Sequence, residues 1–201
     1  MRNLLFILPL AFLFSCDDGR DCCVGPNPVD KELIRGADVS FLPEIEAAGV
    51  KFYDAANTEN NLLDILAASG VNAIRLRLWH TPATEHASLP EVKALAARVK
   101  AKGMKVWLTL HYSDTWADPG HQVKPAAWSE ASFADLQDSV YLYTKKVMTE
   151  INPDIIQIGN EINGGFLLPE GSTDNVPDFV ALLKKGVQAV RESSAETKIM
   201  I

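Results

Sequence analysis

The segment "DIIQIGNEINGG" places two polar side chains directly after a run of buried-type residues. Three isoleucines precede Asn160 and Glu161, and a pair of glycines follows. A carboxyl group at the end of a strand can give a proton to a reacting group and take one back, which is the chemistry of a general acid/base. The alternative is a glutamate that only caps the segment that follows.

Polar side chains also alternate with apolar ones in the segment "AIRLRLW". Arg75, Arg77 and Trp79 share one face of the expected strand, because successive side chains of a strand point to opposite sides. A buried guanidinium needs a carboxylate partner, so we expect each arginine to meet one or to brace the interior of the fold.

The same alternation recurs in two further expected strands. In the segment "VWLTLH", Val and both Leu residues lie on one face, and Trp, Thr and His111 lie on the other. In the segment "IQIGNE", the isoleucines lie on one face, and Gln, Gly and Glu161 lie on the other. A doubly wound sheet is covered on both faces and should be apolar on both, so the pattern favours a barrel whose interior is polar near one end. The polar residues gather toward the C-terminal strand ends, where barrel enzymes have their sites.

The elements that must position these residues alternate along the chain. Helix-like segments that end in small residues or Gly precede short apolar segments, which predicts βα units and a parallel sheet. The expected helices are "LLDILAASG", "EVKALAARVKAKG", "FADLQDSVYLYTKKVMTEINP" and "VPDFVALLKKGVQAVRESSAET". The five expected strands are "RGADVSF", "VNAIRLRLW", "MKVWLTLHY", "DIIQIGNE" and "KIMI".

Composition limits the class of protein. The chain has 201 residues, 47% of them hydrophobic and 22% charged, which is enough apolar material for one sizeable globular core. The formal net charge is −7 and no Lys or Arg cluster occurs. Because phosphate binding needs a concentrated basic face, nucleic acid is not an expected partner.

The N-terminus predicts export. Residues 1–15 have one Arg and then an apolar run that is short for a membrane span, as in a signal peptide. Ser15 before Cys16 resembles the lipobox of bacterial lipoproteins, so we expect a lipidated Cys16 and a tether up to residue 34. The acidic residues after Cys16 fit the outer membrane or cell surface of a Gram-negative bacterium; an ordinary cleaved signal peptide is the alternative.

Cysteine usage is sparse after Cys16. Cys22 and Cys23 are adjacent, and no cysteine follows them. Since neighbouring cysteines do not bridge easily, the sequence predicts neither a disulfide framework nor a cysteine zinc site.

Residues 35–200 resemble a known family. "GADVSF", "IRLRLWHTP", "LTLHYSDTWADPGHQVKPAAW" and "IIQIGNEINGGFLLPEG" together are similar to the endo-β-1,4-galactanases of glycoside hydrolase family 53. The resemblance implies a (β/α)8 barrel that cleaves internal bonds of β-1,4-galactan, found in type I arabinogalactan, with retention of configuration. The Asn-Glu pair alone also occurs in related barrel enzymes that act on mannan, cellulose or xylan.

The resemblance also implies roles for particular residues. Glu161 is the implied general acid/base, and Asn160 is the implied partner of the sugar 2-hydroxyl. Arg75 matches an arginine that keeps the nucleophile ionised, while Arg77 could share that role. His111 matches a histidine that lines the site.

Other candidates follow from their positions near the strand ends. The expected sugar-hydroxyl ligands are Asp38, Ser40 and Asp114. Aromatic faces can stack on galactose rings, and the candidates are Trp79, Trp116 and Trp128, of which we expect Trp128 to belong to the core instead. The three remaining histidines lack a metal-ligand spacing and are expected in loops: His80, His86 and His121. Residues 118–120 are expected to form a turn in the cleft wall.

The nucleophile is the missing part of the pattern. Retaining hydrolysis needs a second carboxylate about 5 Å from the acid/base. The resemblance places it on strand seven, whereas Ile201 lies in the fifth expected strand. Because such barrels need about 250 residues or more, we expect residues 35–201 to be the N-terminal part of a longer catalytic domain and to be inactive alone.

No metal or cofactor is expected in this chain, and any calcium site would lie outside it. A monomer is expected. A surface lipoprotein that binds glycan without cleaving it remains an alternative to the hydrolase.

Overall fold

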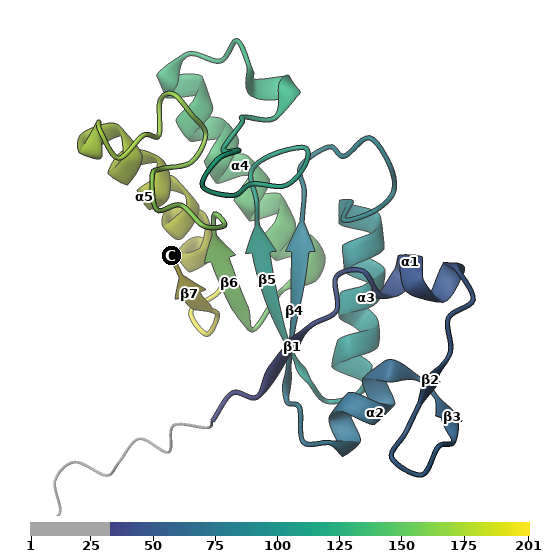
Figure 1. The fold of residues 1–201 in the computed structure, drawn as a ribbon. Helices are drawn as coiled ribbons and strands as arrows, with labels where there is room; N and C mark the ends of the chain where they lie inside the picture. Colours follow the sequence, from purple (N-terminus) through teal and green to yellow (C-terminus); the bar gives the residue numbers. More distant parts are fainter. Residues whose placement is uncertain (1–32) are drawn as a thin grey trace, which may run out of the picture. The chain divides into compact units, whose positions relative to one another are not determined.

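A computed structural model describes residues 33–201, and its compact unit comprises residues 34–201 (Figure 1). The predicted signal peptide, the predicted lipidation of Cys16, the paired cysteines and the tether up to residue 32 lie outside the described residues. Among residues 33–201, no helix has the length and apolar character needed to cross a membrane.

Five parallel strands form one sheet whose order follows the chain. Each strand pairs with the next in the order β1-β4-β5-β6-β7, so the strand order never reverses as it does in a doubly wound sheet. All five expected strands are therefore confirmed. Their bounds are Gly36–Asp38 (β1), Ala73–Leu78 (β4), Lys105–Leu110 (β5), Ile155–Ile158 (β6) and Lys198–Met200 (β7).

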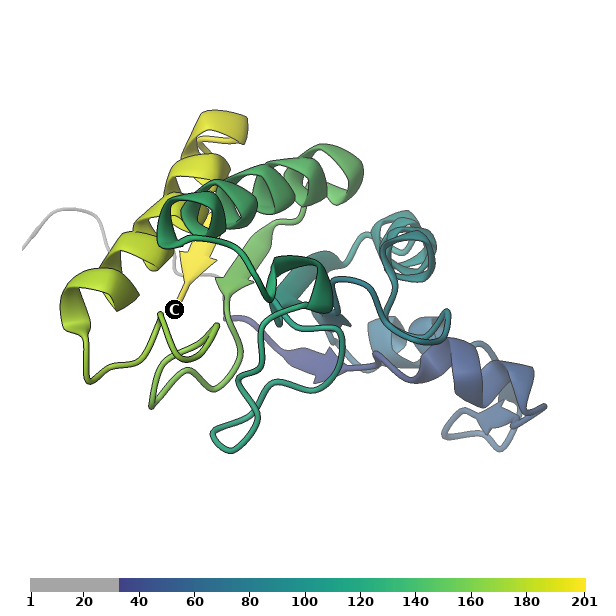
Figure 2. The ribbon, with the colours of Figure 1, turned by 90° about the horizontal axis from the view of Figure 1, so that it is seen from above.

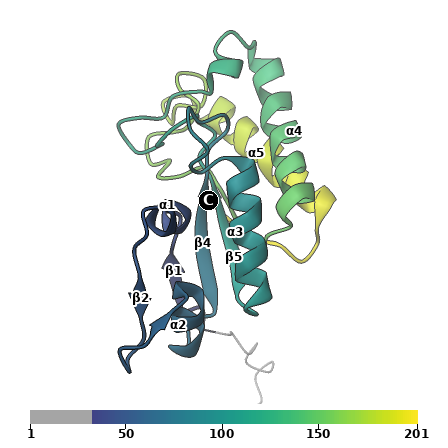
Figure 3. The same ribbon diagram turned by 90° about the vertical axis from the view of Figure 1, so that its right-hand side faces the viewer.

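Helices alternate with these strands, as the sequence predicted. Figure 3 shows α3, α4 and α5 on one side of β4 and β5, and Figure 2, seen from above, shows the helices following one another along an arc. Three of them begin at side-chain caps, where Asn61, Ser88 and Ser132 accept hydrogen bonds from the first helical turn. Their bounds are Leu62–Ala68 (α2), Leu89–Ala101 (α3), Phe133–Ile151 (α4) and Val176–Ser193 (α5).

Four short elements were not anticipated from the sequence. Helix α1 (Leu42–Ala47) follows β1, and a small antiparallel hairpin joins β2 (Phe52–Tyr53) to β3 (Glu59–Asn60). A 3-10 turn, η1 (Ala126–Trp128), lies in the loop after β5. Each is too short to show a helical or strand periodicity.

The predicted division of each strand into an apolar and a polar face is confirmed. Ile74, Leu76 and Leu78 have no exposed surface and join a core that includes residues of α3 and α4. Arg75, on the other face of β4, is partly exposed. The helices therefore cover the apolar face, and the polar face is the interior side expected of a barrel.

The strand register brings the candidate residues to one level. Leu78 pairs with Leu110, and Leu110 pairs with Ile158, so β4, β5 and β6 end side by side. The loops that follow these strands gather at the same end of the sheet, beyond the arrowheads in Figure 1. Residues placed just after each strand, His111 and Glu161 among them, therefore lie at one edge.

Candidate active site

Glu161 is presented by a sharp turn at the end of β6. Gly159 has a φ of +85°, and a Cβ there would lie 2.5 Å from the Ile162 side chain, so only glycine fits. Glu161 itself has a φ of +51°, a left-handed conformation that costs a non-glycine residue roughly 1–2 kcal/mol. Its side chain is exposed. Backbone strain of this kind gathers at functional sites, where the surrounding structure maintains it.

The two glycines of "NGG" have different structural roles. Gly165 has a φ of +117°, and a Cβ would lie 2.2 Å from the Gly171 carbonyl oxygen. A Cβ at Gly164 would meet nothing within 4 Å. The close approach at Gly165 lets the buried Phe166 anchor this loop in the core.

These contacts predict a large effect for one of two neighbouring substitutions and a small effect for the other. Gly165→Ala should lower the free energy of unfolding by about 1–3 kcal/mol, because the backbone must move and an alanine must adopt a positive φ. Gly164→Ala should change it by less than about 0.5 kcal/mol. Urea denaturation of both variants tests this difference; equal stability of the two would contradict it.

Arg75 connects the candidate residues of three strands. Its Nη1 donates to Asp38 Oδ2 at 2.7 Å, and its Nη2 donates to Asn160 Oδ1 at 2.8 Å. Asn160 is 5% exposed and donates from Nδ2 to the Ala117 carbonyl oxygen at 2.7 Å. The guanidinium fork therefore holds the Asn160 amide in one orientation, with its oxygen toward Arg75.

Asp38 and Ser40 belong to the same network. Asp38 Oδ1 accepts hydrogen bonds from Ser40 N at 2.9 Å and Ser40 Oγ at 2.7 Å, and Ser40 Oγ accepts from Arg77 N. Burial alone would raise the pKa of Asp38, but the hydrogen bonds from Ser40 and Arg75 lower that pKa below its usual value. Asp38 is thus an anion at neutral pH. Contact of either residue with a sugar remains a prediction.

Arg77 makes no hydrogen bond or ion pair with a carboxylate among residues 33–201, so its contacts are those of the second expected alternative, a brace. Its Nη2 lies 2.8 Å from His86 Nε2, and its guanidinium lies 3.9 Å from the ring centroid of Trp116. Phe41 and Trp79 add rings at 4.7 Å and 5.1 Å. Aromatic faces replace the carboxylate because the ring quadrupole attracts a cation. Arg77 therefore braces the aromatic side of the site.

His86 is more than the loop residue that the sequence suggested. It is 7% exposed, stacks on Phe41, and has its Nδ1 3.3 Å from Glu44 and 3.4 Å from Glu91. It therefore links Arg77 to carboxylates on α1 and α3. No sequence motif indicated this contact, which involves α1, a helix that the sequence did not predict.

His111 is a neutral ring with a fixed tautomer. Burial, with help from Arg77 and Arg75, lowers its pKa to about 3. Its Nδ1 accepts from Ala117 N at 3.0 Å, so the proton of the neutral ring is on Nε2. That buried Nε2 has no hydrogen-bond partner within residues 33–201. The predicted role of His111 in lining the site stays a prediction.

The candidate tryptophans differ in exposure. Trp128 is 7% exposed and belongs to the core, which confirms its expected place. Trp79 is 9% exposed, makes T-shaped contacts with Trp116 and His86, and has the Arg77 guanidinium over its ring at 5.1 Å, so it is covered by its neighbours. Trp116 is 45% exposed, with Arg77 against its ring. Only Trp116 of these three offers an open face for a sugar.

Asp114 and His80 organise the loops. Asp114 Oδ1 accepts from Thr81 N, and Oδ2 accepts from Ala126 N, both within 2.9 Å. His80 packs against Trp128 and Tyr143, and burial lowers its pKa despite Asp114 nearby. Both oxygens of Asp114 thus tie the loops after β4 and β5 together; its predicted role as a sugar ligand is untested.

The loop after β5 contains the expected turn. Asp118 Oδ1 accepts from Gly120 N at 2.8 Å and faces the exposed His121 ring at 3.0 Å. This confirms a turn at residues 118–120, with His121 in a loop.

Gln122, also in the loop after β5, was missed by sequence reasoning. It is 5% exposed, and its Nε2 donates to the Asn160 carbonyl oxygen at 2.7 Å and lies 3.3 Å from the Glu161 carbonyl oxygen. A polar residue in a loop is normally solvated, so no sequence pattern indicates that Gln122 is buried.

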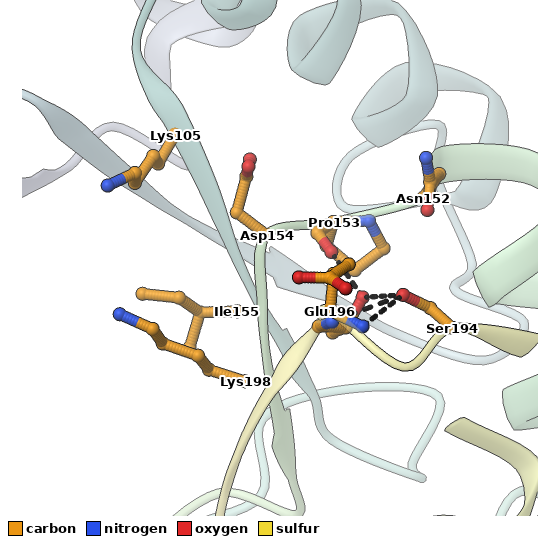
Figure 4. Close-up of a pocket in the computed structure, with 9 residues that line it drawn as sticks. Lys105, Asn152, Pro153, Asp154, Ile155, Ser194, Glu196 and Lys198 are labelled. Atoms are coloured by element: carbon orange, nitrogen blue, oxygen red, sulfur yellow. Dashed lines mark hydrogen bonds between the residues drawn. The ribbon is translucent and has the colours of Figure 1, made fainter. Parts of the chain in front are cut away.

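Two cavities lie at different places on the sheet. One, of about 370 Å³, adjoins Glu161 and is lined also by Gln157, Asn163 and Phe179. The other, of about 330 Å³, lies where β5, β6 and β7 begin and has Asp154 and Thr197 in its wall (Figure 4). Asp154 Oδ2 accepts a hydrogen bond from Val106 N, and Thr197 Oγ1 donates one to the Pro153 carbonyl oxygen. These side chains therefore hold neighbouring strands together where the strands begin.

Within residues 33–201, no group of three or more His, Cys, Asp or Glu side chains could hold a metal ion.

Comparison with known proteins identifies the family. The model of Glycosyl hydrolase family 53 matches residues 34–201. A "Probable arabinogalactan endo-beta-1,4-galactanase A" of Aspergillus terreus is 44% identical over 168 residues, which is 81% of this chain and 48% of that protein. An "Uncharacterized protein in bgaB 5'region" of Niallia circulans is 40% identical over 185 residues, 86% of this chain and 50% of that protein.

Solved structures agree with this match. The "Ignisphaera aggregans GH53 catalytic domain" has a TM-score of 0.80 at 43% identity and covers 86% of this chain and 52% of that one. A structure of "two fungal beta-1,4-galactanases" also has a TM-score of 0.80, at 38% identity, and covers 84% and 52%. The chain thus spans about half the length of the relatives it matches, and its sheet is part of a (β/α)8 barrel. The chain belongs to glycosyl hydrolase family 53.

Proposed function

We propose that the complete protein is an endo-acting, retaining β-1,4-galactanase in which Glu161 is the general acid/base. One observation carries the proposal: in a chain of this family, Asn160 and Glu161 lie at the C-terminal edge of β6, with Asn160 oriented by Arg75. That edge is where (β/α)8 enzymes perform their chemistry.

Glu161 would act twice in each reaction. As an acid, it protonates the glycosidic oxygen of the departing sugar while a second carboxylate attacks the anomeric carbon. As a base, it then takes a proton from the water that releases the sugar from that carboxylate. The family resemblance assigns the second carboxylate to strand seven of the barrel.

The neighbouring groups suit the binding of a neutral polysaccharide. The second Nδ2 hydrogen of Asn160 is a donor for a sugar hydroxyl. Trp116 offers an open aromatic face on which a pyranose ring can stack. Next to these groups, Arg75 and Asp38 form an ion pair at 2.7 Å.

The substrate is tested by hydrolysis of purified polysaccharides. We expect the complete protein to release oligosaccharides from β-1,4-galactan and to leave mannan, xylan and cellulose largely intact. Proton NMR of the first product should show a β-anomer, as retention requires. Hydrolysis of mannan in preference to galactan would favour a related barrel glycosidase, and binding to galactan without cleavage would favour a glycan-binding lipoprotein.

We also propose export and lipid attachment at Cys16, which rest on the sequence alone. A monomer anchored to the outer membrane or cell surface would meet polymeric galactan outside the cell. Metabolic labelling with a fatty acid checks the anchor: label on the parent protein and none on Cys16→Ser is the expected result, and unlabelled parent protein would contradict it.

A further inference from the structure

A three-residue segment joins the loop after β5 to the loop that follows Glu161. We call residues 122–124 the interloop strap. Leu168 N donates to the Gln122 carbonyl oxygen at 2.9 Å, and Val123 forms a parallel bridge with Leu168. Lys124 Nζ pairs with Glu170 Oε1 at 2.7 Å. Consecutive strap residues therefore contact the loop after β6.

The side chain of Gln122 adds a contact at the other end of that loop. Its Nε2 is 2.7 Å from the Asn160 carbonyl oxygen and 3.3 Å from the Glu161 carbonyl oxygen. An amide nitrogen carries two hydrogens, so it can serve both acceptors at once. Gln122 thus holds the peptide unit that joins Asn160 to Glu161 and also contacts the peptide unit that follows.

Glu161 depends on this support because its own side chain has none. Within residues 33–201, no hydrogen bond or ion pair is made by its carboxylate. Its backbone adopts a φ of +51°, and rotation about that bond would swing the side chain away from the edge of the sheet. The main chain therefore sets where the Glu161 side chain leaves the backbone, and Gln122 holds that stretch of main chain.

Resting on the proposed function, we propose that Gln122 is a positioning residue that aims the acid/base Glu161 through the Asn160–Glu161 peptide unit. The buried Gln122 amide acts on the backbone and makes no contact with the reacting atoms. The Lys124–Glu170 pair, with side chains 11% and 26% exposed, keeps the strap in register with the loop it supports.

The test replaces the amide without changing the size of the side chain. Gln122→Met in the complete protein removes both donors and keeps a similar volume. We expect kcat for galactan to fall about 10- to 100-fold with KM changed less than about threefold, because a small misplacement of a catalytic group is costly. Gln188→Met is the matched control, since Gln188 bonds only Glu192 on the exposed face of α5.

A second substrate separates positioning from general damage. A 2,4-dinitrophenyl β-galactobioside has a leaving group that departs without protonation, so its kcat/KM does not need an aimed acid. We expect Gln122→Met to leave this kcat/KM within about threefold of the parent. Equal losses on both substrates, or galactan activity within twofold of the parent, would overturn the proposal.

A double-mutant cycle distinguishes this inference from the proposed function. If Gln122 acts through Glu161, Gln122→Met should cause no further loss on galactan in a Glu161→Gln background. Full additivity of the two losses would overturn the positioning role. Failure of the parent protein to cleave galactan would instead refute the proposed function itself.

Discussion

Replacing Glu161 with Gln is expected to lower kcat for galactan hydrolysis by about 10²- to 10⁴-fold. The glutamine keeps the size of the side chain but can neither protonate the glycosidic oxygen nor activate water. KM should not rise, because the Asn160 donor and the Trp116 face remain. Steady-state kinetics of the complete protein on β-1,4-galactan measures the loss.

The matched control is Glu196→Gln. Glu196 lines the cavity at the opposite end of the strands and should not affect kcat. Circular dichroism should show both variants folded, since Glu161 is exposed and its carboxylate has no partner within residues 33–201. A Glu161→Gln enzyme with more than about a tenth of the parent kcat would contradict the assigned role.

Replacing Arg75 with Lys is expected to lower kcat/KM for galactan by about 10²-fold. A guanidinium can bond Asp38 and Asn160 together through two separate nitrogens, at 2.7 Å and 2.8 Å, whereas an ammonium is a point charge. The Asn160 amide would then lose its fixed orientation although the positive charge remains. The same kinetics, with thermal unfolding recorded beside them, measures this effect.

Arg98→Lys provides the control for this substitution. Arg98 also forms a two-pronged ion pair, with Glu46 at 2.7 Å and 2.8 Å, but that pair joins α3 to α1. It should leave kcat/KM unchanged while altering stability by about 1 kcal/mol or less. If Arg75→Lys retained kcat/KM within threefold of the parent, orientation of Asn160 by Arg75 would not matter for the reaction.

The strands and their polar faces were predictable because they rest on local patterns. Alternation in "AIRLRLW" assigned Arg75 and Arg77 to one face, and the apolar run before Asn160 predicted the strand that ends beside Glu161. Parallel pairing in chain order then brings the strand ends to one level. The face of each strand residue follows from the two-residue period of a strand, and the common level of the strand ends follows from the parallel direction of the strands.

The contacts between loops could not be predicted in the same way. Gln122 lies 38 positions from Asn160 in the chain, and its burial depends on how two loops fold over the strand ends. Arg77 shows the same limit: the sequence left open whether it meets a carboxylate or braces the interior, and it did not indicate the aromatic rings and His86 that surround it. Sequence patterns report which side of a strand a residue faces, but they do not report which loop covers it.

Azide rescue tests the role of Glu161 most directly. A Glu161→Ala variant of the complete protein should react with 2,4-dinitrophenyl β-galactobioside and then stall, because no base activates water for the second step. Added azide needs no base, so it should restore turnover and yield a β-galactobiosyl azide, identified by proton NMR. Azide that neither raises the turnover nor appears in a β-linked product would contradict the assignment of Glu161 as the acid/base of a retaining glycosidase.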